Sequence, residues 1–193
     1  MCKLCETKPV YEFTNKRKVC KSCFIRWFQK KILYTIRKFS LIEKNDLIGY
    51  ESGKGFRSVV LENVLKMYSE KAIVEVVRLH SKTKPNKIAI ASTIDSESQK
   101  IVHELIKGDV KNLKEVLPIT SAPPPPHRQL LIKPLYLFLD KEVLLYAKLK
   151  GLKFAKVKKE KADEIGKFVN GLEKKHPEVK RAIVKGVLEI NFS

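Results

Sequence analysis

The sequence predicts an α/β protein: a small N-terminal zinc ribbon followed by a domain in which strands and helices alternate. Three observations support this. All four cysteines lie within the first 23 residues, β-branched segments alternate with amphipathic ones, and 44% of the 193 residues are hydrophobic, enough for a core. No stretch reaches the roughly 18 uninterrupted apolar residues of a membrane span, and no signal-peptide segment follows Met1. We therefore expect a cytoplasmic protein without membrane association.

The cysteines form two pairs, Cys2-x-x-Cys5 and Cys20-x-x-Cys23. A two-residue spacer lets both sulfur atoms of a pair face one point, so two pairs offer the tetrahedron of thiolates that Zn²⁺ accepts. A rubredoxin-like iron would use the same spacing, whereas disulfides would suit a secreted chain. We expect a structural zinc ion in a ribbon over residues 1–23, with four protein ligands and no open position for catalysis.

The charge balance indicates a polyanionic partner. Forty Lys and Arg residues stand against 21 Asp and Glu residues, which gives a net charge of +19. A surplus of this size attracts nucleic acid before other polyanions. The alternative is a lysine-rich surface that serves solubility or heat tolerance, but glutamate would then rise together with lysine.

A basic linker helix is expected over residues 24–45, because apolar side chains recur there at every fourth position. These apolar residues are Phe24, Phe28, Ile32 and Ile36. Trp27 stands at the edge of this face, where we expect it to pack in the core and not to stack on a base. A second face carries Arg26, Lys30 and Arg37, with Lys31 and Lys38 nearby. This second face suits a helix that tracks phosphates or, alternatively, one that is merely solvated.

From residue 46 to residue 122 the pattern becomes α/β. The first expected elements are a strand over 47–50, a glycine-containing loop over 51–58 and a helix over 59–68 with Ser58 as N-cap. Strands over 72–79 and 87–92 are expected next. A helix from 93 to 106 follows, with a Ser96-x-x-Gln99 capping box and an end near Gly108. The connection between the last two strands is shorter than the dozen residues that adjacent parallel strands need. We therefore expect these strands to be antiparallel, non-adjacent or not both strands.

Residues 123–193 are expected to complete the same domain with basic helices. The expected order begins with a stiff spacer at Pro123–Pro126 and a helix that has Asp140 as N-cap, runs through Lys150 and stops at Gly151. A last strand over 152–157 and helices over 161–175 and 178–189, broken at His176-Pro177, follow.

The loop over 51–58 lies between an expected strand and an expected helix, where backbone N–H groups and a helix N-terminus bind phosphates. It contains Gly49-x-x-x-Gly53-Lys54-Gly55, one residue shorter than a Walker loop and without the hydroxyl residue that follows its lysine. The loop is therefore not a Walker loop.

The order of these segments resembles the tRNA 2-thiolation enzymes of the PP-loop ATP pyrophosphatase superfamily. The residues that carry the resemblance are the two cysteine pairs, Ile106-Lys107-Gly108-Asp109, Ile132-Lys133-Pro134-Leu135, Lys141-Glu142-Val143 with Tyr146-Ala147, and Leu172 to Pro177. The resemblance covers most of the chain and implies a reduced Rossmann-like PP-loop domain of the adenine nucleotide alpha hydrolase type. It also implies a shortened, degenerate member, because the nucleotide motif is altered.

Family members carry Ser-Gly-Gly-Lys-Asp-Ser, which holds the phosphates of ATP. With the last serine placed on Ser58, Arg57 stands at the aspartate and Phe56 at the lysine. Of the family's Gly-His-Asn-x-Asp-Asp segment one acid remains, Asp95. The resemblance thus implies a vestigial nucleotide loop made of Ser52, Gly53, Lys54, Gly55, Arg57 and Ser58, with Asp95 as its acid.

Sulfur transfer in the family uses cysteines outside the zinc finger, as a persulfide or as iron–sulfur ligands. This sequence has none there, because its four cysteines form the metal set. We therefore expect a non-catalytic, zinc-containing protein that binds tRNA or another structured RNA, with an active paralogue or a sulfur-carrier protein as partner. Two alternatives are an ATP–Mg²⁺-dependent enzyme that takes sulfur ligands from a partner, and a protein–protein adaptor. The residues expected to contact RNA are Lys16, Arg17, Lys18, Arg26, Lys30, Lys31, Arg37 and Lys38, with Arg128 near the vestigial loop.

Overall fold

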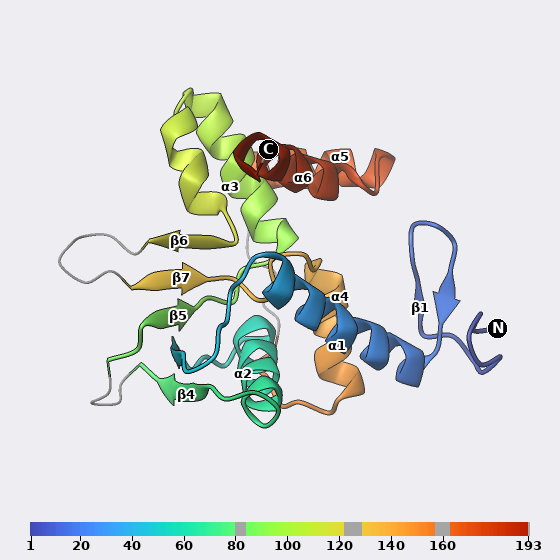
Figure 1. Ribbon diagram of the computed structural model, residues 1–193. Coiled ribbons are helices and arrows are strands. Elements are labelled where there is room, and N and C mark those ends of the chain that lie inside the picture. Colours follow the sequence, from blue (N-terminus) through green and yellow to red (C-terminus); the bar gives the residue numbers. More distant parts are fainter. Residues whose placement is uncertain (80–83, 122–128, 157–162, 193) are drawn as a thin grey trace.

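The computed structural model describes residues 1–79, 84–121, 129–156 and 163–192 (Figure 1). A hairpin of β1 (Tyr11–Glu12) and β2 (Lys18–Val19) forms the N-terminal ribbon. The remaining elements are, in order, α1 (Lys21–Lys38), β3 (Leu47–Tyr50), α2 (Phe56–Ser69), β4 (Glu75–Arg78), β5 (Lys87–Ala89), α3 (Ile94–Lys107), the 3-10 helix η1 (Val110–Val116), β6 (Ile119–Ser121), β7 (Leu130–Ile132), α4 (Asp140–Leu149), α5 (Glu164–Lys175) and α6 (Val179–Phe192). The ribbon projects from one side of the α/β domain, at the N-terminal end of α1.

The central sheet has the strand order β4-β3-β5-β7-β6. Strand β3 pairs in parallel with both β4 and β5, and β5 pairs in parallel with β7. Strand β6 pairs with β7 in the antiparallel orientation. This arrangement confirms the α/β class. β4 and β5 lie on opposite sides of β3, so the two strands with the short connection are indeed non-adjacent.

The short connection from β4 to β5 explains the glycine in β3. Leu79 donates its backbone N–H to the Tyr50 carbonyl at 3.1 Å as β4 ends. A β-carbon at Gly49 would lie 2.6 Å from Cγ of Pro85 and 2.7 Å from Cδ2 of Leu79. The residues on both sides of the connection therefore pack directly on β3 at a position where only glycine fits.

Gly49→Ala should lower the free energy of unfolding by about 1–3 kcal/mol, because the proline ring cannot move aside as a flexible side chain would. Gly171→Ala in α5 is the control, since nothing lies within 4 Å of its added β-carbon. It should raise stability by about 0.5–1 kcal/mol. Urea unfolding of both variants measures the difference, and equal midpoints would contradict this packing.

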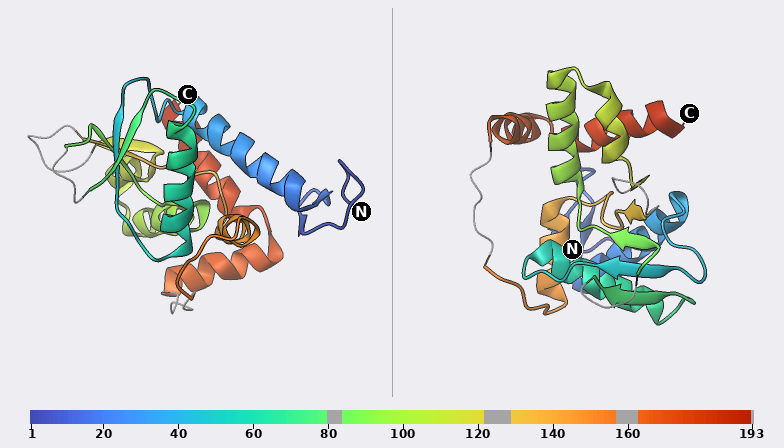
Figure 2. Two further views of the ribbon diagram at one scale, coloured as in Figure 1. Left: turned by 90° about the horizontal axis from the view of Figure 1, so that it is seen from below. Right: turned by 90° about the vertical axis from the view of Figure 1, so that its left-hand side faces the viewer.

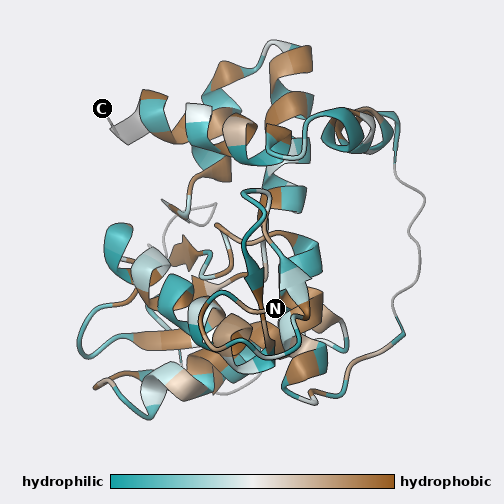
Figure 3. Ribbon diagram, turned by 90° about the vertical axis from the view of Figure 1, so that its right-hand side faces the viewer, coloured by the Kyte–Doolittle hydropathy of each residue, from teal (hydrophilic) through white to brown (hydrophobic). Residues whose placement is uncertain are grey.

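Helix α1 is part of the core. Phe24, Phe28, Ile32 and Ile36 are all buried, as the four-residue spacing predicts. The ring of Phe28 stacks on that of Tyr146 in α4, with centroids 4.1 Å apart. Trp27 is half-buried against this cluster and packs edge-on against neighbouring rings. The helices show brown and teal residues side by side in Figure 3, as amphipathic helices do.

The remaining helices divide between the two halves of the sheet. Helix η1 contacts β6, α3 packs against η1, and α5 and α6 pack against α3, whereas α2 contacts β4 and α4 (Figures 1 and 2). The two expected C-terminal helices are present, and they are separated at His176-Pro177. No helix in the described ranges is both long and apolar enough to cross a membrane. The expected proline spacer, Pro123–Pro126, lies outside the described residues.

Several local expectations are wrong. Helix α2 begins at Phe56 with Gly55 as N-cap, three residues before the expected start after Ser58. The capping box of α3 pairs Thr93 with Ser96, because a serine hydroxyl at the third helical position accepts the N–H of Thr93 at 2.9 Å. Gly108 and Gly151 end their helices with φ of 73° and 67°, as expected.

The expected strand over 152–157 is also wrong for its described residues, 152–156. The segment is irregular because it bonds to the loop that follows β3: the Ala155 N–H donates to the Lys54 carbonyl at 2.7 Å. Strands β6 and β7 and helix η1 were not expected, since segments this short carry no clear periodicity.

Candidate functional site

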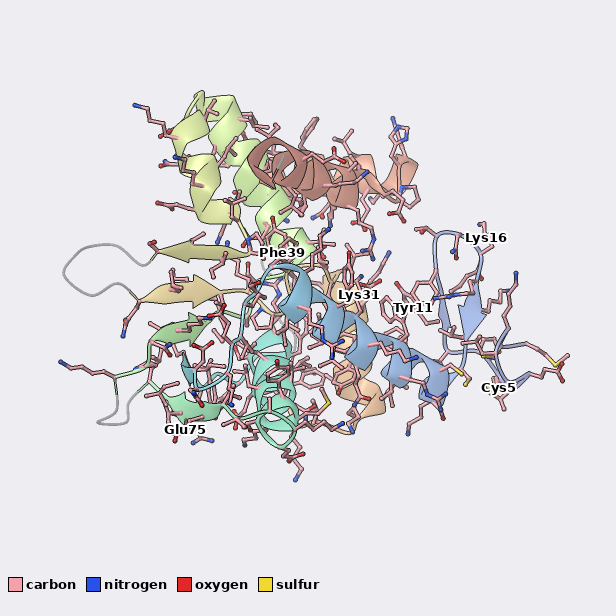
Figure 4. The ribbon with its side chains drawn as sticks, viewed as in Figure 1. Cys5, Tyr11, Lys16, Lys31, Phe39 and Glu75 are labelled. Atoms are coloured by element: carbon pink, nitrogen blue, oxygen red, sulfur yellow. The ribbon has the colours of Figure 1, made fainter. Side chains whose placement is uncertain are left out.

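The four cysteines come together at the junction of the ribbon and α1. Cys2 and Cys5 lie in a tight turn, closed by a 3.0 Å bond from the Glu6 N–H to the Cys2 carbonyl. Cys20 precedes α1 and Cys23 lies in its first turn, where the helix N-terminus favours thiolates. All four sulfur atoms lie within 4.8 Å of one another, and Cys5 Sγ is 3.3 Å from Cys20 Sγ. Figure 4 shows Cys5 at the outer end of the molecule.

Neighbouring hydrogen-bond donors and the other thiols shift the pKa values of the cysteines in this group. The N–H of Leu4, which donates to Cys2 Sγ at 3.5 Å, lowers the pKa of Cys2. The hydroxyl of Thr7 is the main cause that lowers the pKa of Cys20 to about 6. The hydrogen bond with Cys20 raises the pKa of Cys23 to about 12, because a thiol beside a thiolate keeps its proton. Full ionisation of the set therefore requires a cation among the four sulfur atoms.

The geometry suits one metal ion. Four thiolates around one zinc ion lie about 3.8 Å apart, given a Zn–S distance of about 2.3 Å. A [4Fe–4S] cubane holds each thiolate on a different iron, which spreads the sulfur atoms further. Because four protein ligands fill a tetrahedral shell, the bound ion would brace the ribbon against α1 and supply no open coordination position.

We expect the purified protein to contain one zinc ion per chain by metal analysis. Cys20→Ser should release the ion and lower the melting temperature, because the remaining thiolates lose their charge compensation. Ser22→Ala, on an exposed neighbour, is the control and should retain the metal. Iron with the visible absorption of a cluster would instead contradict a mononuclear site.

A cavity of about 830 Å³ opens at the carboxyl ends of the parallel strands, the edge at which α/β proteins bind ligands. Gly55, Arg57 and Ser58 of the expected vestigial loop line it. The other lining residues are Phe56, Ala91, Asp140, Lys141, Leu144, Ala155 and Lys156. A cavity of this size can hold a nucleotide-sized ligand.

The remaining residues of the expected loop, Ser52, Gly53 and Lys54, do not line the cavity. A β-carbon at Gly53 would lie 2.6 Å from Ser58 Oγ, so the loop folds tightly onto the first turn of α2. The carbonyl of Lys54 is bound by the 152–156 segment. Ser52 precedes this turn on an exposed stretch.

Two residues that line the cavity, Arg57 and Asp140, belong to a network of charged and polar groups. Arg57 Nε donates to Asp140 Oδ1 at 2.7 Å, and the Thr93 hydroxyl donates to the same oxygen at 2.7 Å. The backbone N–H of Asp140 donates to Asp95 Oδ2 at 2.7 Å, and Lys180 Nζ donates to Asp95 Oδ1 at 2.6 Å. Lys180, only 3% exposed, also pairs with Glu173 at 2.6 Å. Both carboxylate oxygens of Asp95, the acid expected beside the vestigial loop, therefore already accept hydrogen bonds.

A second charged cluster surrounds Glu142, which is fully buried in α4. Its carboxylate accepts from Arg181 at 2.7 Å, from the Leu139 N–H at 2.9 Å and from the Tyr11 hydroxyl at 3.3 Å. Lys31 Nζ lies 3.8 Å from the same carboxylate and 4.7 Å from the centroid of the Phe138 ring. Burial is the main cause that lowers the pKa of Lys31 to about 8. Figure 4 shows Lys31 and Tyr11 on neighbouring parts of the molecule.

The stability of the protein should rise from pH 8 to pH 10 because of Lys31. In this window the folded protein has lost the ammonium proton and the unfolded chain still holds it, so the unfolded state binds more protons. The gain over Lys31→Met should reach at most about 2 kcal/mol. Above pH 10 the trend reverses, because burial raises the pKa of Tyr11 and the unfolded chain then releases its phenolic proton first. Unfolding by urea across this range tests the sign, and parallel curves for the two proteins would contradict it.

The structure separates the expected RNA contacts into groups. Arg26, Lys30, Arg37 and Lys38 are exposed on α1, and Lys16 and Lys18 are exposed on the hairpin. Arg17 is half-buried over the Phe13 ring, 4.7 Å from its centroid. Lys31 points inward to Glu142 and does not join the exposed face. Arg128 lies outside the described residues.

Sequence reasoning missed the partners of the expected site residues. The sequence marks Asp140 only as an N-cap, a place that Leu139 takes in the structure, and it gives no signal for Lys180, which lies among the basic residues of a helix expected to be basic. Tyr34 and Lys71 line hollows beside the exposed face of α1. Tyr34 could have been found, since it lies four residues after Lys30 and four before Lys38 on one helix face.

No protein-family model matches the chain, and no curated protein matches it. A solved structure does: the U34-tRNA thiolase NcsA from Methanococcus maripaludis with its [4Fe-4S] cluster. The match has a TM-score of 0.76 at 20% sequence identity and covers 98% of this chain and 86% of that one. The fold expected from the resemblance to the PP-loop tRNA thiolation enzymes is therefore confirmed.

Proposed function

We propose that this protein is a zinc-containing, non-catalytic tRNA-binding relative of the tRNA 2-thiolation enzymes and that it works beside an active paralogue or a sulfur-carrier protein. The shared fold with a tRNA thiolase supports the substrate class. The net charge of +19 and the exposed cations of α1 support binding to a polyanion.

The non-catalytic part of the proposal rests on one observation: the candidate reactive groups are already bound to other groups of the same protein. All four cysteines of the sequence lie in one metal-binding group, so no thiol is left to carry sulfur or to hold a second metal centre. At the cavity, Arg57 is held by Asp140, and Asp95 is held by Lys180. Two groups that could handle ATP and Mg²⁺, Arg57 and Asp95, are thus engaged within the protein.

Binding of the zinc-loaded protein to tRNA at two salt concentrations tests the proposal. The affinity should fall steeply as salt rises, because each phosphate contact releases counterions. Replacement of Arg26, Lys30 and Arg37 together by alanine should weaken binding at least about tenfold and reduce the slope of log affinity against log salt by up to about 3.

The matched control removes Lys107, Lys111 and Lys114, which are exposed on α3 and η1, away from α1 (Figure 1). It changes the net charge equally and should change the affinity far less. Absent or salt-insensitive binding of the unmodified protein would overturn the proposal. Equal losses in both triple variants would reduce the role of α1 to its bulk charge.

The cavity favours a second candidate, an ATP-dependent tRNA-modifying enzyme that takes sulfur ligands from a partner. The cavity has a volume of about 830 Å³ and lies at the N-terminus of α2, and both properties suit a nucleotide. Thermal melting with and without ATP–Mg²⁺ separates the candidates, since a ligand at one hundred times its Kd stabilises by about 2.7 kcal/mol. An unchanged melting temperature at millimolar ATP–Mg²⁺ favours the non-catalytic protein.

A further inference from the structure

The exposed face of α1 carries two adjoining hollows. One, of about 520 Å³, is lined by Lys30, Leu33, Tyr34, Arg37 and Lys38. The other, of about 350 Å³, lies between α1 and the end of α2. It shares Lys30, Leu33 and Arg37 with the first and is completed by Arg26, Gln29, Met67, Tyr68, Lys71 and Ala72. Lys30 and Arg37 therefore form a basic ridge between two partly apolar hollows.

Tyr34 is the aromatic residue of the first hollow and is 54% exposed, although burial of its ring would be favourable. Lys30 and Lys38 stand one turn before and one turn after it, and Lys38 Nζ lies 5.8 Å from the ring centroid. A flat, exposed ring is thus surrounded by cations.

The charges of this face are not balanced locally. The eighteen residues of α1 include six Lys and Arg and no acidic residue. Among the described residues, no carboxylate forms an ion pair with Arg26, Lys30, Arg37 or Lys38, whereas Lys31 on the inner face is paired with Glu142. The helix separates a neutralised inner face from an unneutralised outer one, as expected when the counter-charge comes from a ligand.

We propose that this face binds an unpaired stretch of RNA, with one base stacked on Tyr34 and the flanking phosphates held by Lys30, Arg37 and Lys38. Every base has a π-face, so an exposed tyrosine among cations binds single strands without reading their sequence. Lys30 and Arg37 lie two helical turns apart, about 10 Å along the axis, so they can hold phosphates on both sides of the stacked nucleotide. A duplex offers phosphates but no free base face, so the site distinguishes unpaired from paired RNA.

This inference rests on the proposed function and is tested separately from it. The probes are a single-stranded oligoribonucleotide and a blunt RNA duplex with the same number of phosphates. Tyr34→Ala should weaken binding to the single strand by about 5- to 100-fold and leave duplex binding within about twofold. Tyr34→Phe keeps the ring and should stay close to the unmodified protein. Phe168→Ala, which removes a similarly exposed aromatic residue (57%) on α5, should change neither affinity.

A measurement on the unmodified protein keeps the test independent of variant folding. Stacking on Tyr34 should quench or shift the fluorescence of a 2-aminopurine placed in the single strand and not of one placed in the duplex. If tRNA binds but Tyr34→Ala changes no affinity and 2-aminopurine does not respond, the stacking site is overturned and the proposed function stands. If the unmodified protein binds no RNA, both are overturned, and an acidic protein surface becomes the partner of this face.

Discussion

The buried carboxylate of Glu142 joins four parts of the chain that lie far apart in sequence. It accepts hydrogen bonds from Tyr11 in the ribbon, from Arg181 in α6 and from the N-terminus of its own helix, and it faces Lys31 in α1. Taking a carboxylate out of water costs several kcal/mol, and only well-placed donors and cations offset this cost. The ribbon, α1, α4 and α6 must therefore meet correctly for Glu142 to be tolerated. The cluster makes their relative placement specific, beyond what the aromatic packing of Phe28 and Tyr146 would impose.

This constraint also decides how α1 presents its charges. The apolar face of the helix packs in the core. Its cations divide between Lys31, which pairs with Glu142 inside, and the residues that face solvent. Because the inner face is packed in the core and the cysteine group lies at the helix N-terminus, the backbone that carries the outer cations is anchored by the fold. An anchored backbone loses little conformational freedom on binding, which would favour the proposed binding of a flexible single strand.

The cavity combines a shared framework with charged groups that bind one another. The chain shares the fold of a tRNA thiolase over nearly its whole length, yet at the strand ends Arg57, Asp140, Asp95 and Lys180 form an internal chain of opposite charges. These ion pairs and hydrogen bonds link the N-termini of α2, α3 and α4 to one another. Function resides in sites built on folds, and here the clearest candidate sites are the cysteine group and the face of α1.

By itself, the sequence determined the cysteine group, the apolar face of α1 and the alternation of strands and helices, and it left three arrangements for β4 and β5, of which the structure has the non-adjacent one. Each depends on spacing within a few residues: two between cysteines, four along a helix, or a connection too short for neighbouring parallel strands. Only the tertiary structure decided that Arg57 meets Asp140, 83 positions away, that Lys180 reaches Asp95, and that Lys31 turns inward while Lys30 remains outside. Local periodicity places a residue on a face, but the packing of distant elements decides what that face meets, and so which charge is neutralised and which remains available to a ligand.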